Sequence, residues 1–205
     1  MPSKLLQTDA FILLKRPPAD SYQAFTVFAP DIGNLQVLQR LPKKSSSGQT
    51  LLDLFDEAAL QLESSNQGRT WFLREVRLIN RPAAIGRSYD ALRFASALAA
   101  LVARHPAPAE GRAQLSALLR TAFAAFATAG RPDIVYLKSL YCFARDEGHP
   151  VREQWFPTLS PSDRASLTTL LNRPLAEQTA APAEVARLLG RLETYLRSHT
   201  EILLE

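Results

Sequence analysis

The segment TDAFILLKRPPADSYQAFTVFAPDIGNLQVLQR at residues 8–40 contains the pattern that decides the fold. It consists of three short apolar runs separated by turn-forming clusters, and the runs are residues 8–16, 22–29 and 35–40. Aromatic and β-branched residues in runs of this length are typical of β-strands. Proline ends such strands because it has no N–H to donate, and glycine and asparagine favour the turns between them. We therefore expect a three-stranded meander at the start of the chain.

Two further runs extend the β pattern to residue 79. The first ends in an alternation from Ala58 to Glu63, which has the period of a half-buried strand. In residues 70–79 the large apolar side chains change parity midway, so we expect a β-bulge near Arg74 and Glu75. Five short strands before residue 80 predict a small closed barrel of the OB type, with an SH3-like barrel as the alternative.

The pattern becomes helical from Ser88 onward, where apolar residues recur at spacings of three and four. The segment Ser160-Pro161-Ser162-Asp163 combines an N-cap serine, a proline at the first helical position and an acid in the first turn, so it predicts a helix start. Gly148 is expected to end an earlier helix. The sequence thus predicts an α+β protein in which an OB-type barrel at 1–80 is followed by an all-α helical domain at 81–205.

The composition is that of an ordinary globular protein, with 46% hydrophobic and 21% charged residues among 205. The formal charge of +4 is a slight basic excess, which favours polyanionic partners but also fits a mixed, solvated surface. A single cysteine cannot form an internal disulfide, and we find neither a signal-peptide pattern nor an apolar stretch long enough to span a membrane. We expect a cytoplasmic protein that does not contact membranes.

The motifs of common enzyme classes are missing from the sequence. The eight glycines never have the spacing of a phosphate-binding loop, and the three histidines do not have the spacing of paired metal ligands. Cys142 stands between Tyr141 and Phe143 in an expected helix, so we interpret it as an inert core thiol rather than a nucleophile. We expect no catalysis, no cofactor and no metal site.

The remaining pattern suits phosphate contact. Five basic residues close strands or stand in the loop after the third strand, where folding of a barrel could gather them on one rim: Lys15, Arg16, Arg40, Lys43 and Lys44. Among the aromatic residues Tyr22, Phe25 and Phe28, an exposed ring could stack on an unpaired base, and we take Tyr22 as the candidate. The alternative interpretations are core packing for the aromatic residues and a solvated loop for the basic ones.

Taken in chain order, these segments resemble RecO proteins. The similar segments are TDAFILLKR at 8–16, APDIG at 29–33, RTWFLREVRLI at 69–79, FARDEGHPV at 143–151, LSPSDRASLTTLLNRPLAE at 159–177 and LETYLRSHTEILLE at 192–205. The resemblance implies a DNA repair and recombination mediator that binds single- and double-stranded DNA without sequence preference and anneals complementary strands. It also implies that RecR and the single-stranded-DNA-binding protein are partners in loading recombinase.

The chain departs from the RecO pattern at three places. The four-cysteine zinc module of many family members has no counterpart, because residues 152–158 are a short segment without cysteine. The family's glycine followed by paired arginines after the third strand is replaced by RLPKK at 40–44, and the basic C-terminal ending is replaced by ILLE at 202–205. The alternative function is therefore a RecO-shaped protein-interaction module with weak or no DNA binding.

Overall fold

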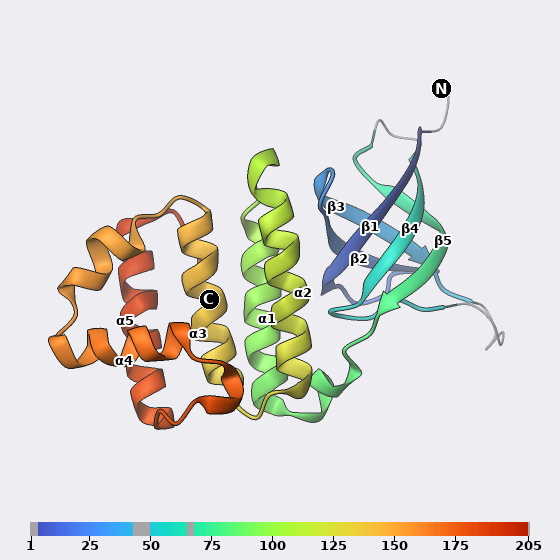
Figure 1. Ribbon diagram of the computed structural model, residues 1–205. Coiled ribbons are helices and arrows are strands. Elements are labelled where there is room, and N and C mark those ends of the chain that lie inside the picture. Colours follow the sequence, from blue (N-terminus) through green and yellow to red (C-terminus); the bar gives the residue numbers. More distant parts are fainter. Residues whose placement is uncertain (1–3, 43–49, 65–67, 205) are drawn as a thin grey trace. The chain divides into compact units, whose positions relative to one another are not determined.

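The computed structural model describes residues 4–42, 50–64 and 68–204, and Figure 1 shows the strands wrapped into a barrel and the helices that follow them. The strands are β1 (Lys4–Lys15), β2 (Tyr22–Ala29), β3 (Gly33–Arg40), β4 (Glu57–Ser64) and β5 (Trp71–Asn80). They form a closed barrel in the order β1-β2-β3-β5-β4, in which β3 and β5 are parallel and the other pairs are antiparallel. The expected five-stranded barrel followed by helices is confirmed.

The parity change within β5 is a β-bulge, as the sequence predicts. Gln61 of β4 pairs with Glu75, but the next residue, Leu62, pairs with Leu73, so that Arg74 is the extra residue. A bulge moves the following side chains to the opposite face of the strand. It thereby turns apolar side chains on both sides of the shift toward the barrel interior.

The barrel interior is filled by apolar side chains from all five strands. They include Ile12, Phe25, Val27, Val37, Leu60, Leu62 and Trp71, each at most 3% exposed. Phe25 is therefore a core residue, which is the alternative that the sequence left open for the aromatic residues. Phe28 is also fully buried, although its neighbours Val27 and Ala29 occupy the opposite face of β2.

The helical part begins with a short turn η1 (Ala83–Arg87) and contains five α-helices. These are α1 (Tyr89–Arg104), α2 (Arg112–Thr128), α3 (Pro132–Asp146), α4 (Pro161–Asn172) and α5 (Pro182–His199), with short helical segments η2 (Ala109–Gly111), η3 (Val151–Trp155), η4 (Phe156–Thr158) and η5 (Leu175–Glu177). The helix α3 packs against α4, α5 and η3. Its buried face includes Ile134, Leu137, Leu140 and Ala144.

Two helix ends follow the local signals in the sequence. The Ser160 side chain accepts a hydrogen bond of 3.2 Å from the Asp163 N–H, and Pro161 is the first residue of α4. After α3, Gly148 has φ +85°, and the His149 N–H donates to the Ala144 carbonyl at 3.0 Å. A left-handed glycine with this bond pattern closes a helix because it satisfies carbonyls that the last turn leaves open.

The chain divides into two compact units. The first contains Met1–Pro82 and Val102–Ser116, and the second contains Ala83–Leu101 and Ala117–Glu205. Within the first unit, the Asn34 amide donates to the carbonyls of Val102 and Ala103 at 3.0 and 3.1 Å. Because Asn34 is the register partner of Phe28, the last turn of α1 lies on this face of the barrel. This contact explains why an outward ring such as Phe28 is buried.

Candidate nucleic-acid interface

Three of the sequence-predicted binding residues lie where β1, β2 and β3 meet at one end of the barrel. Tyr22, the first residue of β2, is the register partner of Arg40, the last residue of β3. Arg16 follows β1 directly, and its N–H donates to the Ala24 carbonyl of β2 at 3.0 Å. The side chains of Arg16 and Arg40 are exposed, and Tyr22 is half-buried. Folding therefore brings these three residues to the same end of the barrel.

The alternation of each strand decides which face of the barrel a side chain occupies. Phe25 and Val27 of β2 and Val37 of β3 belong to the barrel core. Successive side chains of a strand point to opposite faces, so Tyr22 and Leu38 lie on the outer face. Tyr22 is thus the half-buried ring of the three candidates, whereas Phe25 and Phe28 are buried.

The parallel pairing of β3 with β5 adds a second aromatic ring beside Tyr22. Leu38 is the register partner of Phe72, and the Tyr22 and Phe72 rings meet edge to face, with centroids 5.8 Å apart and an interplanar angle of 70°. Both rings are half-buried, so part of each reaches solvent. We call the four residues Tyr22, Leu38, Arg40 and Phe72 the seam patch. Within this patch, Arg40 is the register partner of Tyr22.

Lys15 belongs to a different cluster. Its ammonium lies 3.0 Å from the Asp53 carboxylate. Burial alone would raise the pKa of Asp53, but the hydrogen bonds from Lys15 and the Leu54 N–H and the charges of Lys15 and Arg81 outweigh it and lower that pKa. Lys15 therefore carries a partly compensated charge, whereas no acidic partner of Arg16 is found in the described part of the chain. Lys43 and Lys44, the other two candidates, lie outside the described residues.

Asp56 and Arg81 extend the same cluster. The Asp56 carboxylate is fully buried, and the Arg81 guanidinium holds it with two bonds, from Nε at 2.8 Å and from Nη2 at 2.6 Å. The Asp53 N–H donates to the same carboxylate at 2.8 Å. This arrangement ties the segment before β4 to the end of β5. Its role is to position backbone, because its charged groups satisfy one another.

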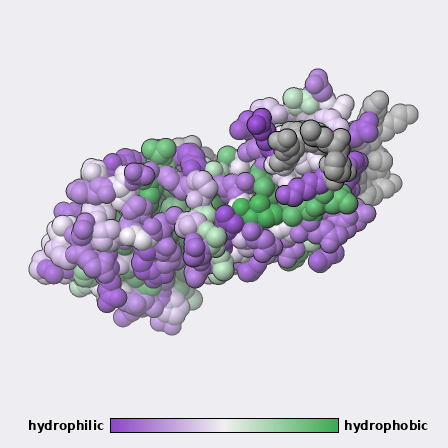
Figure 2. Space-filling view, turned by 90° about the horizontal axis from the view of Figure 1, so that it is seen from above, coloured by the Kyte–Doolittle hydropathy of each residue, from purple (hydrophilic) through white to green (hydrophobic). Residues whose placement is uncertain are grey.

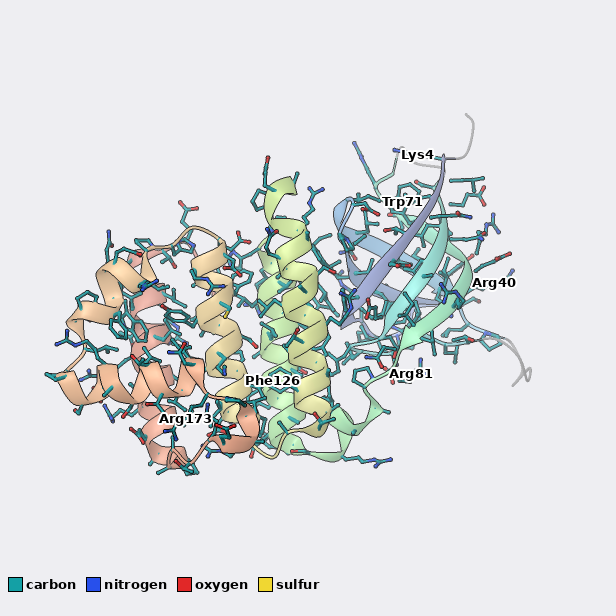
Figure 3. All side chains as sticks on the ribbon, in the orientation of Figure 1. Lys4, Arg40, Trp71, Arg81, Phe126 and Arg173 are labelled. Carbon is teal, nitrogen blue, oxygen red and sulfur yellow. The ribbon has the colours of Figure 1, made fainter. Side chains whose placement is uncertain are left out.

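Figure 3 shows the labelled barrel residues with their side chains, and Arg40 extends away from the strands. Lys4 lies beside Trp71, with its ammonium 6.0 Å from the centre of that ring. Trp71 is only 3% exposed, so it cannot serve as a stacking surface. Figure 2 shows that the barrel surface includes a band of hydrophobic residues, whereas the helical part is more uniformly hydrophilic from the same side.

The geometry of the seam patch suits one kind of chemistry. Aromatic rings at a surface stack on unpaired bases of any sequence, and arginines contact the phosphates that link them. Tyr22 and Arg40 are sequence-predicted binding residues, whereas Phe72 and Leu38 are not among those candidates and are added by the structure. The available signal was the parity of β5, since the bulge at Arg74 places Trp71 inside the barrel and leaves Phe72 outside.

Two further kinds of site were searched for within residues 4–42, 50–64 and 68–204. No group of three or more histidine, cysteine or acidic side chains there is arranged to hold a metal ion. No helix in that part of the chain is long and apolar enough to cross a membrane. Cys142 is half-buried and borders a cavity instead of lying in the core as expected, and burial raises the pKa of its thiol.

No protein-family model matches this sequence, and a search of curated proteins finds no match either. The functional interpretation therefore depends on the geometry above and on the resemblance of the segments.

Proposed function

We propose that this protein is a recombinational-repair mediator that binds single- and double-stranded DNA without sequence preference. The observation that carries the proposal is the seam patch, in which the rings of Tyr22 and Phe72 are in contact and Tyr22 is the register partner of the exposed residue Arg40. Small barrels of this architecture bind oligonucleotides on the face of strands 2 and 3. Tyr22 and Arg40 occupy that face.

The contacts available at the patch favour single strands. A base in a duplex is stacked on its neighbours, whereas an unpaired base offers its flat face to an aromatic ring. Arginine contacts to phosphates position a strand but carry no sequence information, and stacking accepts any base, so this surface suits binding without sequence preference. Duplex DNA would bind through charge alone and more weakly.

The wider role rests on the resemblance to RecO proteins. It consists of annealing complementary strands and helping to load recombinase together with RecR and the single-stranded-DNA-binding protein. Binding without catalysis and a cytoplasmic location belong to the same proposal. A stacking surface is suited to annealing, because it contacts the flat face of a base and leaves the hydrogen-bonding edge accessible to a complementary strand.

Fluorescence anisotropy with a labelled oligothymidylate tests the proposal. We expect binding at low ionic strength and a steep loss at higher salt, because each neutralised phosphate of a single strand releases about 0.7 of a counterion. Phe72→Leu keeps an apolar side chain but removes the ring, and it should weaken binding by about 1–3 kcal/mol, the usual contribution of one stacked base. Arg40→Glu should reduce both the affinity and the salt dependence.

Arg77→Glu is the matched control, because Arg77 is exposed on the same barrel and lies on β5 well beyond the pair that joins β3. If Arg77→Glu weakens binding as much as Arg40→Glu does, the patch is not the contact surface. If the protein binds no DNA at low salt but is retained by immobilised RecR, the interaction-module alternative replaces the proposal.

A further inference from the structure

A cavity of about 370 Å³ lies in the helical unit between α3, α4 and the short segments that precede α4. On α3 it is lined by Lys138, Tyr141 and Arg145, which share one face because they are three and seven residues apart. On α4 it is lined by Thr168 and Asn172, four residues apart. Arg152 of η3 completes the lining. The cavity thus collects three cationic side chains from two separate elements.

The charges around this cavity are only partly compensated. Arg145 Nε donates to the Asp146 carboxylate at 2.8 Å, and the Lys138 ammonium donates to the Arg173 carbonyl at 3.0 Å. Arg152 is exposed, and among the described residues it has no ion-pair partner. The lining itself has these three cationic side chains and no carboxylate; Asp146 pairs with Arg145, and Glu153 is near enough to act on the lining residue Tyr141.

The charge states of Cys142 and Lys138 also bear on the anion affinity of the cavity. Cys142 also lines it, and burial raises the pKa of this thiol, so the sulfur is neutral at physiological pH. Burial lowers the pKa of Lys138 because desolvation disfavours its ammonium, and that ammonium donates to a backbone carbonyl, a neutral acceptor. An anion in the cavity would supply a charged partner.

The two arginines of α5 differ from these residues. Arg187 and Arg191 donate to the two oxygens of the Asp163 carboxylate, at 2.5 and 2.9 Å. That carboxylate is 3% exposed, so part of their charge is neutralised inside the fold. The cavity at α3 is therefore the stronger attractor for an anion.

We propose that this cavity binds a phosphate monoester, with Arg152, Lys138 and Arg145 as its cationic contacts. A phosphate monoester carries a charge of about −1.5 to −2 at neutral pH and offers three acceptor oxygens, which matches the three cationic side chains of the lining. A diester of a nucleic-acid backbone carries only one negative charge. The group belongs either to a free nucleotide or to the 5′ end of a DNA strand, and the second source rests on the proposed function.

Calorimetric titration with inorganic phosphate and with thymidine 5′-monophosphate tests the site, and thymidine is the ligand without a phosphate. We expect both phosphates to bind and thymidine not to bind. Arg152→Gln should weaken phosphate binding by roughly tenfold or more, since a charged hydrogen bond is lost. Arg87→Gln, an exposed arginine of η1 outside the cavity, is the matched control and should bind as the unchanged protein does.

Lys138→Met keeps the apolar stem of the lysine, and Asn172→Asp places a negative charge in the cavity; both should also lose phosphate binding. If Arg152→Gln and Asn172→Asp bind phosphate as tightly as the unchanged protein, the proposal is wrong. If inorganic phosphate and the mononucleotide both fail to bind, it is wrong as well.

Oligothymidylates with a 5′-phosphate or a 5′-hydroxyl identify the source of the group. Tighter binding of the phosphorylated strand, lost in Arg152→Gln, supports a strand end, whereas equal binding of the two strands supports the free nucleotide. The Arg40→Glu variant separates this site from the barrel function, because it should lose DNA binding and retain phosphate binding in the cavity.

Discussion

Asp56 is a buried acid of the barrel unit whose stability depends on its ion pair with Arg81. Its carboxylate is fully buried, and two of its three bonds come from Arg81, whose own side chain is 40% exposed. Removing either partner breaks the same bonds, but the group left behind differs. A buried carboxylate that has lost its cation destabilises the fold far more than a guanidinium that has lost its carboxylate but can be hydrated.

We therefore expect Arg81→Ala to lower the free energy of unfolding by about 3–5 kcal/mol, the usual cost of stranding a buried charge. Asp56→Asn leaves Arg81 hydrated and should cost about 1.5–3 kcal/mol. Urea unfolding of both variants measures the difference. Lys15→Ala, which removes an exposed pair, should cost less than about 1 kcal/mol and serves as the control. Equal effects of Arg81→Ala and Asp56→Asn would contradict this account.

A second residue-scale prediction concerns acid. The hydrogen bond from Arg187, with help from Ser160 and the charge of Arg191, outweighs burial and lowers the pKa of Asp163 below its usual value of 3.8. A carboxyl whose pKa is lower in the folded state stabilises the fold above its unfolded pKa. That contribution is lost as the pH falls through 3.8 toward the folded value.

We expect Asp163→Asn to destabilise the protein at pH 7, and we expect this difference to shrink as the pH falls below 3.8, because the unchanged carboxyl then becomes protonated as well. Burial raises the pKa of Glu147 and Glu193, so these two groups act in the opposite direction and remain in both proteins. Unfolding curves across this acid range therefore isolate Asp163 as the difference between the two. A constant difference at all pH values would refute the assignment.

At the scale of elements, glycine has opposite roles in two helices. Gly148 ends α3 with φ +85°, a conformation that a side chain disfavours. Gly190 lies inside α5, where an added Cβ would meet no atom within 4 Å. The same substitution should therefore have opposite signs at the two positions.

Gly148→Ala should lower the free energy of unfolding by about 1–2 kcal/mol because the Cβ of alanine is strained in the left-handed conformation. Gly190→Ala should raise it by about 0.5–1 kcal/mol because alanine favours the helix. Thermal unfolding followed by circular dichroism measures both. Stabilisation by Gly148→Ala would show that the helix end does not need this conformation.

The elements were also what could be predicted best from the sequence. Local signals identified the N-cap at Ser160, the stop at Gly148 and the bulge at Arg74, because each depends on residues close in the chain. The seam patch could not be predicted in the same way. Phe72 reaches Tyr22 only through the pairing of Leu38 with Phe72, which joins distant segments and has no local signal.

At the scale of the whole molecule, the compact unit that contains the barrel also includes residues from beyond β5. Residues Val102–Ser116 belong to the same compact unit, and Asn34 binds the carbonyls at the end of α1. Arg112 reaches the Asp31 carbonyl at 3.2 Å. These contacts cover a barrel face on which Phe28 would otherwise be open to water.

A fragment of residues 1–82 should therefore unfold at a lower temperature than the intact protein and bind a dye that reports exposed apolar surface. Phe28→Thr should reduce dye binding in the fragment, but in the intact protein it should destabilise the fold. Comparison of the four proteins by thermal unfolding and dye fluorescence checks both effects. A fragment as stable as the intact chain would show that the barrel needs no cover.

The joint between β3 and β5 consists of the pairs Val37 with Trp71 and Leu38 with Phe72. The β1–β2 joint has four pairs, and the remaining neighbouring strands pair along most of their length. Local opening begins where few backbone bonds must break. The amide protons at this joint should exchange with solvent before those of the other strands. Because the seam patch spans the joint, a nucleic acid bound there would hold the barrel shut, and slower exchange would report its occupancy.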